Sequence, residues 1–194
     1  MRALTSIILA AGLMFAVGGL AYADINPSAN PTVTKVGNNF LWQYELFTDA
    51  AQTVDTTKNA SFFTIYDVNG LITGSENFNS AVLGLTGVAT HPLLGDTPLG
   101  VLPSDSPFIP NVSVAFAGAA SFSTDLGTLS FLDTQGASNI VQSQFAAQGT
   151  ELNSSRSFNS SFVEAPAPEP GSLMLLSSGI LGMVGMGLRR FRKR

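Results

Sequence analysis

The chain contains a single histidine, His91, so any catalysis that relies on a histidine base would have to use it. Metal sites built on several histidines are therefore excluded. A hydrolytic triad also needs a nucleophile beside the base, and no glycine-framed serine lies near His91. His91 precedes Pro92 in a proline-rich stretch, which predicts a solvent-exposed loop histidine.

Carboxylate pairs are the second candidate for catalysis. Asp96 with Asp105, or Asp125 with Asp133, could act as general acid and base if each pair came together in the fold. The spacing does not fix their separation, and acidic residues of this kind usually solubilise a surface. We therefore expect no catalytic residue and no cofactor.

Oxygen ligands for a calcium ion occur together at one place. Asp67, Asn69 and the Gly70 carbonyl resemble part of an oxygen-rich loop, but the full spacing of an EF-hand is absent. Turn chemistry explains the same residues equally well, because Asn-Gly is a favoured hairpin turn. We expect no metal site here, and calcium stays an alternative.

Side chains suited to sugars form two further groups. The first is a set of aromatic residues that could stack on sugar rings, although their alternating strand positions are typical of core packing: Trp42, Tyr44, Phe62, Phe63 and Tyr66. The second is a set of Asn-X-Ser sequences that match the glycosylation acceptor pattern, which in bacteria is only permissive; they begin at Asn59, Asn111, Asn153 and Asn159.

Composition divides the chain into an acidic middle and basic ends. All 13 acidic residues lie between Asp24 and Glu169, where only Lys35, Lys58 and Arg156 are basic, so this part carries a net charge of −10. Such a charge argues against a nucleic-acid partner. The chain has no cysteine, which excludes disulfides and thiol chemistry and favours a bacterial exported protein.

The first 23 residues have the layout of a signal peptide. Arg2 supplies the positive start, Ile7 to Leu20 the apolar region, and Ala21 and Ala23 the small residues of a cleavage site. We expect export through the Sec translocon and cleavage by signal peptidase after Ala23. An uncleaved membrane helix is the alternative, but the apolar stretch is short for a span.

The C-terminal end has the layout of a short membrane span with a cationic stop. Residues 171–188 carry no charge, and 18 residues of helix cover about 27 Å, just enough for the hydrocarbon core of a bilayer. The positive-inside rule places the basic tail, residues 189–194, in the cytoplasm. Its charged residues are Arg189, Arg190, Arg192, Lys193 and Arg194.

A plain anchor would explain the span but not the sequence Pro168-Glu169-Pro170 at its outer edge. This tripeptide, the short span and the Arg-rich end together resemble the PEP-CTERM sorting domain of bacterial exported proteins. The likeness covers about 27 of the 194 residues and departs mainly at Gly171, where a serine often follows the tripeptide.

The resemblance implies a partner and a destination. It implies that Pro168, Glu169 and Pro170 are recognised by an exosortase, a membrane transpeptidase-like protease of bacteria that make extracellular polysaccharide. Residence in the inner membrane would then be transient, before release to the cell surface or extracellular matrix. Exopolysaccharide is the partner that such a destination suggests.

Residues 24–162 read as an antiparallel β-sandwich, and residues 163–170 as a proline-rich spacer. Period-two alternation over residues 40–47 places Phe40, Trp42, Tyr44 and Leu46 on one face of a strand and Gln43 and Glu45 on the other. The stretch 90–110 contains five prolines and predicts a long surface loop. The other predicted strands are 32–36, 61–68, 81–88, 111–116, 119–123, 128–132, 139–145 and 156–163.

Two local structural predictions and two readings of the function complete the sequence analysis of the exported domain. Asn69-Gly70 predicts a hairpin turn, and residues 140–148 fit a strand better than a short helix. For function, the first reading is a noncatalytic exported surface or matrix protein. The second is an exported carbohydrate-active hydrolase, or a calcium-dependent glycan-binding module, with the same sorting signal.

Overall fold

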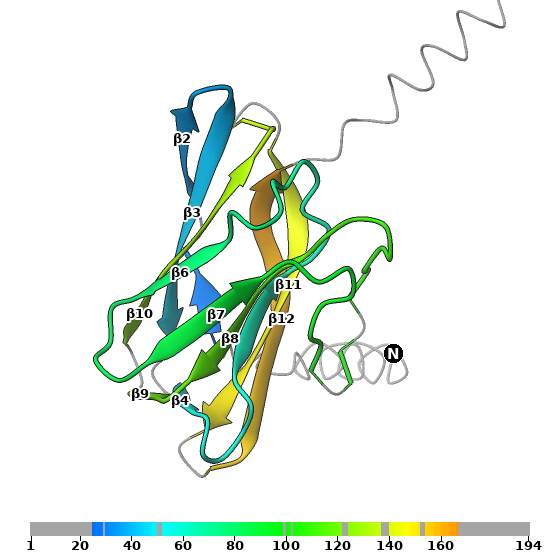
Figure 1. Cartoon of the computed structure of the whole chain (residues 1–194). Helices are drawn as coiled ribbons and strands as arrows, with labels where there is room; N and C mark the ends of the chain where they lie inside the picture. The colour runs from blue at the N-terminus through cyan, green and yellow to red at the C-terminus, as the bar shows by residue number, and fades with distance from the viewer. Residues whose placement is uncertain are drawn as a thin grey trace, which may run out of the picture.

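The computed structural model describes residues 25–28, 30–49, 52–98, 100–101, 103–121, 124–136, 140–151 and 154–166. Within these ranges the chain is mainly β, with antiparallel pairing throughout and no α-helix. The strands form two sheets (Figure 1). The predicted class is therefore confirmed at the level of antiparallel β structure.

The first sheet has five strands. Its order is β1-β3-β10-β6, with β2 also paired to β3. The strands are β1 (Ile25–Pro27), β2 (Thr32–Val36), β3 (Asn39–Thr48), β6 (Asn77–Ser80) and β10 (Asp125–Asp133).

The second sheet has seven strands. Its order is β7-β8-β5-β11-β4-β9, with β12 paired to the other side of β11. The strands are β4 (Gln52–Asp55), β5 (Phe62–Ile65), β7 (Thr86–Thr90), β8 (Val112–Ala117), β9 (Ala119–Ala120), β11 (Ile140–Glu151) and β12 (Arg156–Pro166). Figure 1 shows β11 and β12 side by side along their lengths.

The two sheets share one apolar core, to which β3 contributes one face of its side chains. Its even-numbered residues Trp42, Tyr44 and Leu46 are fully buried, because a strand turns alternate side chains to the same face. In the paired strand β10, Phe131 lies opposite Trp42. Apolar residues of the second sheet, such as Phe63, Ile65, Val114 and Phe145, belong to the same cluster.

Most strand predictions match the structure. Residues 32–36 form β2 with the predicted bounds, and residues 40–47 form β3 with one more residue at each end. Residues 140–148 are strand, and β11 continues to Glu151. The stretch 81–88 was predicted as one strand, which is wrong: β6 ends at Ser80 and β7 begins at Thr86 in the other sheet.

The hairpin predicted at Asn69-Gly70 is also wrong. Gly70 does adopt a positive φ of 90° in a turn. However, the preceding strand β5 pairs with β8 and β11, and the following strand β6 pairs with β10. The turn therefore carries the chain from one sheet to the other.

The predicted spacer begins later than expected. β12 runs to Pro166, and its last residues pair with β11 as Val163 with Ser143 and Pro166 with Ile140. Val163 and Ala165 are buried, so the core holds residues 163–166 in the sheet. The segment 167–170 lies outside the described residues, as do the predicted signal peptide, span and basic tail.

Among the residues that the structure describes, no helix is long and apolar enough to cross a membrane.

Candidate functional site

The outer face of the five-stranded sheet carries rows of polar side chains. Thr32 lies opposite Gln43, and Gln43 lies opposite Ser130 on the next strand. In the neighbouring row Glu45 lies opposite Thr128. These side chains share one face because residues directly opposite in an antiparallel pair point the same way.

A pocket of about 200 Å³ opens on this polar face. Ser28 shapes one wall, because its N–H donates to the Glu45 backbone oxygen at 2.7 Å and its Oγ accepts from the Glu45 N–H at 3.3 Å. These bonds hold the segment after β1 against β3. The pocket is lined by Ser28, Asn30, Thr32, Gln43, Glu45 and Thr128.

The lining defines what the pocket can bind. Hydroxyls and amides both donate and accept hydrogen bonds, and Glu45 adds a carboxylate acceptor. The volume is below the range of about 300–1,000 Å³ typical of drug-sized ligands, so it suits a single small polar ring. Phe47 follows Glu45 by two residues on the same face and is 41% exposed, which places an aromatic surface beside the polar one.

Sequence alternation had placed Gln43 and Glu45 on the face opposite Trp42 and Tyr44, and the structure confirms that placement. What the sequence did not reveal was that Ser28 and Thr128 lie beside them. Thr128 is more than 80 residues away along the chain and arrives only through the pairing of β10 with β3.

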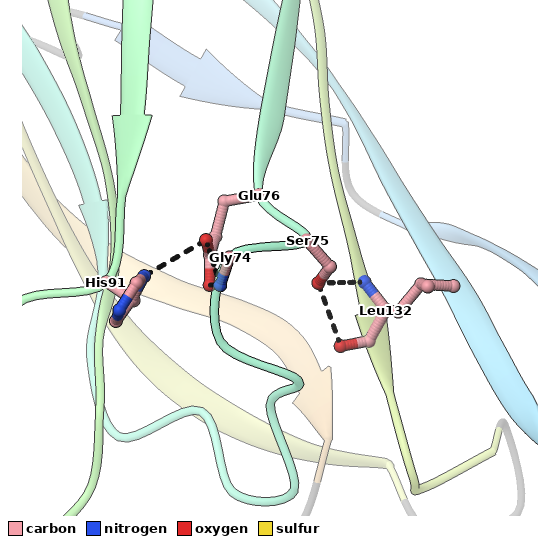
Figure 2. A network of polar contacts seen from close by, with 5 residues as sticks. All are labelled: Gly74, Ser75, Glu76, His91 and Leu132. Carbon is pink, nitrogen blue, oxygen red and sulfur yellow. Dashed lines mark hydrogen bonds and ion pairs between the residues drawn. The ribbon is translucent and has the colours of Figure 1, made fainter.

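The surroundings of His91 do not have the geometry of a catalytic triad. His91 Nδ1 lies 3.1 Å from Glu76 Oε2, and the Glu76 carboxylate also accepts from the Gly74 N–H at 2.9 Å (Figure 2). Ser75 is adjacent in sequence, but its Oγ accepts from the Leu132 N–H at 2.9 Å. Figure 2 shows the Ser75 hydroxyl directed toward Leu132 and away from His91. As predicted, His91 is exposed, with 43% of its side chain accessible.

Of the two carboxylate pairs considered for catalysis, Asp125 and Asp133 do not come together, whereas Asp96 and Asp105 both lie near Tyr66, whose pKa is raised by burial and by these two acids. Asp125 and Asp133 occupy opposite ends of β10, and eight residues of strand separate them by about 27 Å. Asp105 accepts hydrogen bonds from the Gly95 N–H and from Asn111 Nδ2, both at 3.0 Å. Asp96 contributes its backbone oxygen to the Tyr66 hydroxyl at 2.8 Å.

Asn111 organises the proline-rich loop. Its Oδ1 accepts from the Asp67 N–H at 2.7 Å, while its Nδ2 donates to Asp105. Asp67 Oδ1 in turn accepts from the Ser106 N–H at 2.9 Å. Burial raises the pKa of Asp67, and the nearby Asp105 raises it further. The network fixes the loop between β7 and β8 against the outer face of the second sheet.

Two of the oxygen groups considered for calcium already accept hydrogen bonds from the protein. Asp67 belongs to the Asn111 network, whereas the Gly70 oxygen accepts from the Thr134 N–H at 3.0 Å. No group of three or more His, Cys, Asp or Glu side chains that could hold a metal occurs among the described residues.

Asp133, at the end of β10, is a buried acid. Its Oδ1 accepts from the Gln135 N–H at 2.6 Å, and its Oδ2 has no hydrogen-bond partner among the described atoms. Burial raises the pKa of Asp133 from 3.8 to about 6, although the N–H groups of Gln135 and Thr134 act in the opposite direction. Sequence gave no signal for this, since Asp133 ends a strand as many surface acids do.

The aromatic residues considered for sugar stacking are core residues. All five are buried, and Tyr44 stacks on Phe131 at a ring separation of 5.8 Å. Burial also removes two glycosylation acceptors, because Asn111 is inaccessible and Asn159 is only 6% exposed. Asn59 donates to Thr150 Oγ1 at 3.2 Å, and Asn153 lies outside the described residues.

The residues of the predicted sorting signal are all outside the described part of the chain. They are Pro168, Glu169 and Pro170, together with Ala21 and Ala23 of the cleavage site and the basic tail Arg189, Arg190, Arg192, Lys193 and Arg194.

No protein-family model, curated protein or solved structure matches the chain.

Proposed function

We propose that the chain is a noncatalytic exported protein of the bacterial cell surface or extracellular matrix, sorted by an exosortase that recognises Pro168-Glu169-Pro170. The observation that carries this proposal is the order of the C-terminal parts: a proline-flanked glutamate, an uncharged run of 18 residues and a cluster of five basic residues. A signal peptide at the other end supplies the entry to the same route.

The described domain supports a binding role over a catalytic one. His91 pairs with Glu76 while the neighbouring Ser75 hydroxyl is bonded to Leu132, so a nucleophile–base pair is not assembled there. The polar pocket around Gln43 and Glu45 offers hydroxyl and amide donors and acceptors, and one carboxylate acceptor, to a polyhydroxylated ligand. Matrix polysaccharide is the ligand class that combines this chemistry with the proposed destination.

Sorting is tested in the producing bacterium. Glu169→Ala should leave an unprocessed, membrane-retained precursor, and so should deletion of the five basic residues at the end of the chain. Glu151→Ala is the matched control, because it removes a glutamate from the end of β11 and leaves the sorting signal intact. An unchanged mature size and location in Glu169→Ala refutes recognition of this signal.

Polysaccharide binding is tested separately on protein purified from the producing cells. The protein should bind the producer's own exopolysaccharide, and Gln43→Ala combined with Thr128→Ala should weaken this binding at least tenfold. Thr73→Ala combined with Thr86→Ala removes exposed polar groups outside the pocket and serves as the control. Turnover of a glycan or ester panel by the purified protein would contradict the noncatalytic assignment.

A further inference from the structure

β12 is a long edge strand. On one side it pairs with β11 over its whole length, from Arg156 opposite Thr150 to Pro166 opposite Ile140, without a register shift. On the other side no described strand pairs with it. Such an edge presents backbone N–H and C=O groups to another chain, and proteins usually protect it with lysine, proline or a bulge. Near the C-terminal end of β12, the Glu164 oxygen accepts a hydrogen bond from the Tyr44 hydroxyl at 2.8 Å. β12 has no lysine, and its only proline is its last residue.

The outer face of β12 adds apolar surface to this edge. Phe158 is 47% exposed and Phe162 is 59% exposed, whereas Asn159 and Val163, on the other face, are buried. The two phenylalanines are four residues apart and therefore point the same way. Ser160 lies midway between them, also exposed.

The side chains on this face are symmetric about Ser160. Phenylalanines stand two residues before and two residues after it, at Phe158 and Phe162. Opposite charges stand four residues before and four residues after it, at Arg156 and Glu164. In an antiparallel pair of two identical strands centred on Ser160, each residue meets the one that mirrors it.

We propose that the chain forms a twofold-symmetric dimer in which β12 pairs antiparallel with β12 of a second copy, with Ser160 opposite its own copy. Each Phe158 then faces Phe162 of the second copy, and each Arg156 faces Glu164 of the second copy. The interface is self-complementary, as a twofold interface requires. The two seven-stranded sheets become one continuous sheet.

Charge complementarity indicates that the chain pairing with the edge of β12 is a second copy of this protein. Within one chain Arg156 and Glu164 are eight strand residues apart, about 27 Å, so they cannot pair with each other. Neither forms an ion pair with another described residue. A register centred on Ser161 instead would place Phe158 opposite Glu164, so aromatic and charged pairs together select the Ser160 register.

Cysteine cross-linking tests this register in the full-length chain, which has no cysteine of its own. Residues directly opposite in a sheet have Cβ atoms about 4.5–5.5 Å apart, close to the span of a disulfide, so Ser160→Cys should give a covalent dimer on mild oxidation. Ser161→Cys is offset from its copy by two residues and should react poorly. Thr90→Cys, on the edge strand β7, should stay monomeric. A yield for Ser160→Cys no higher than for Thr90→Cys overturns the proposal.

Charge reversal provides an independent test. Arg156→Glu and Glu164→Arg should each weaken dimerisation about tenfold, because each places two like-charged pairs across the interface. The double variant should restore it, since every pair is again of opposite charge. Restoration cannot arise within one chain, given the separation of the two residues.

Sedimentation equilibrium tests the contribution of the Phe158–Phe162 pairs. It also tests whether β12 binds a second copy of the chain or a different protein. Phe158→Ser combined with Phe162→Ser should lower the dimer fraction at sedimentation equilibrium, whereas Phe108→Ser, at an 88% exposed loop position, should not. Circular dichroism and thermal unfolding establish that each variant is folded. A wild-type chain that stays monomeric, or that binds another protein through β12 without self-association, contradicts the proposal.

Discussion

The Tyr44 hydroxyl donates a hydrogen bond of 2.8 Å to the backbone oxygen of Glu164, and so joins the central strand of one sheet to the edge strand of the other. Tyr44 is fully buried, and burial, Asp133 and Glu164 together raise its pKa well above 10. The hydroxyl therefore remains protonated, and remains a donor, at neutral pH.

Loss of this hydroxyl should loosen β12. Tyr44→Phe keeps the ring in the core but leaves the Glu164 oxygen without its partner, at a cost of about 1–2 kcal/mol in the free energy of unfolding. Hydrogen exchange should show faster exchange in β12. Tyr66→Phe is the comparison: it loses bonds to Asp96 and Thr97 in the proline-rich loop and should accelerate exchange there, while β12 is unaffected.

Asp133 should make stability depend on pH between about 4 and 6. Its folded pKa of about 6 exceeds the ordinary value of 3.8, so the folded state holds a proton that the unfolded state releases. Stability from this residue is therefore greatest below pH 4 and is lost as pH rises through 6. At 1.36 kcal/mol per pKa unit, this shift sets an upper limit of about 3 kcal/mol on the penalty at pH 7.

Asp133→Asn removes the titrating group and keeps an acceptor for the Gln135 N–H. Relative to the native chain, this variant should gain stability as pH rises from 4 to 7, in denaturant titrations at each pH. Parallel curves for the native chain and Asp133→Asn would contradict the raised pKa.

Asn111 should control the proline-rich loop. Asn111→Ala removes the acceptor for the Asp67 N–H and the donor to Asp105, and should cost about 2–4 kcal/mol because buried groups lose their partners. Limited proteolysis should cut residues 91–110 faster. Asn111→Asp should be at least as harmful at pH 7, because it sets a carboxylate against Asp105. The exposed Asn77→Ala should have little effect on either measurement.

Gly127 should tolerate no side chain. It has a φ of +127° at the register shift in β10, and a Cβ there would lie 2.1 Å from the Asn79 backbone oxygen. Gly127→Ala should therefore destabilise the fold by about 3 kcal/mol or more. Gly37→Ala is the control: its φ of +63° is also positive, but the space around it is open, so about 1 kcal/mol is expected from backbone strain alone. Equal thermal shifts in the two variants would contradict the contact with Asn79.

The predicted strands and the predicted faces depended on short-range pattern. Alternation over residues 40–47 placed Trp42 and Tyr44 inside and Gln43 and Glu45 outside, and the structure agrees. The same reasoning failed for residues 81–88, where apolar residues near a turn look like strand. Local pattern is sufficient for faces because the side-chain period of a strand is a property of its own backbone.

The sequence by itself determined the antiparallel β class, the core face of β3 and the exposed setting of His91. Only the tertiary structure decided that Ser28 and Thr128 meet Gln43 at one pocket, that Asp125 and Asp133 are far apart, and that β12 lies at a sheet edge. Each of these depends on which strands pair across long separations. Strand pairing across long separations depends on how all the buried side chains pack together, so it cannot be predicted from a local sequence pattern.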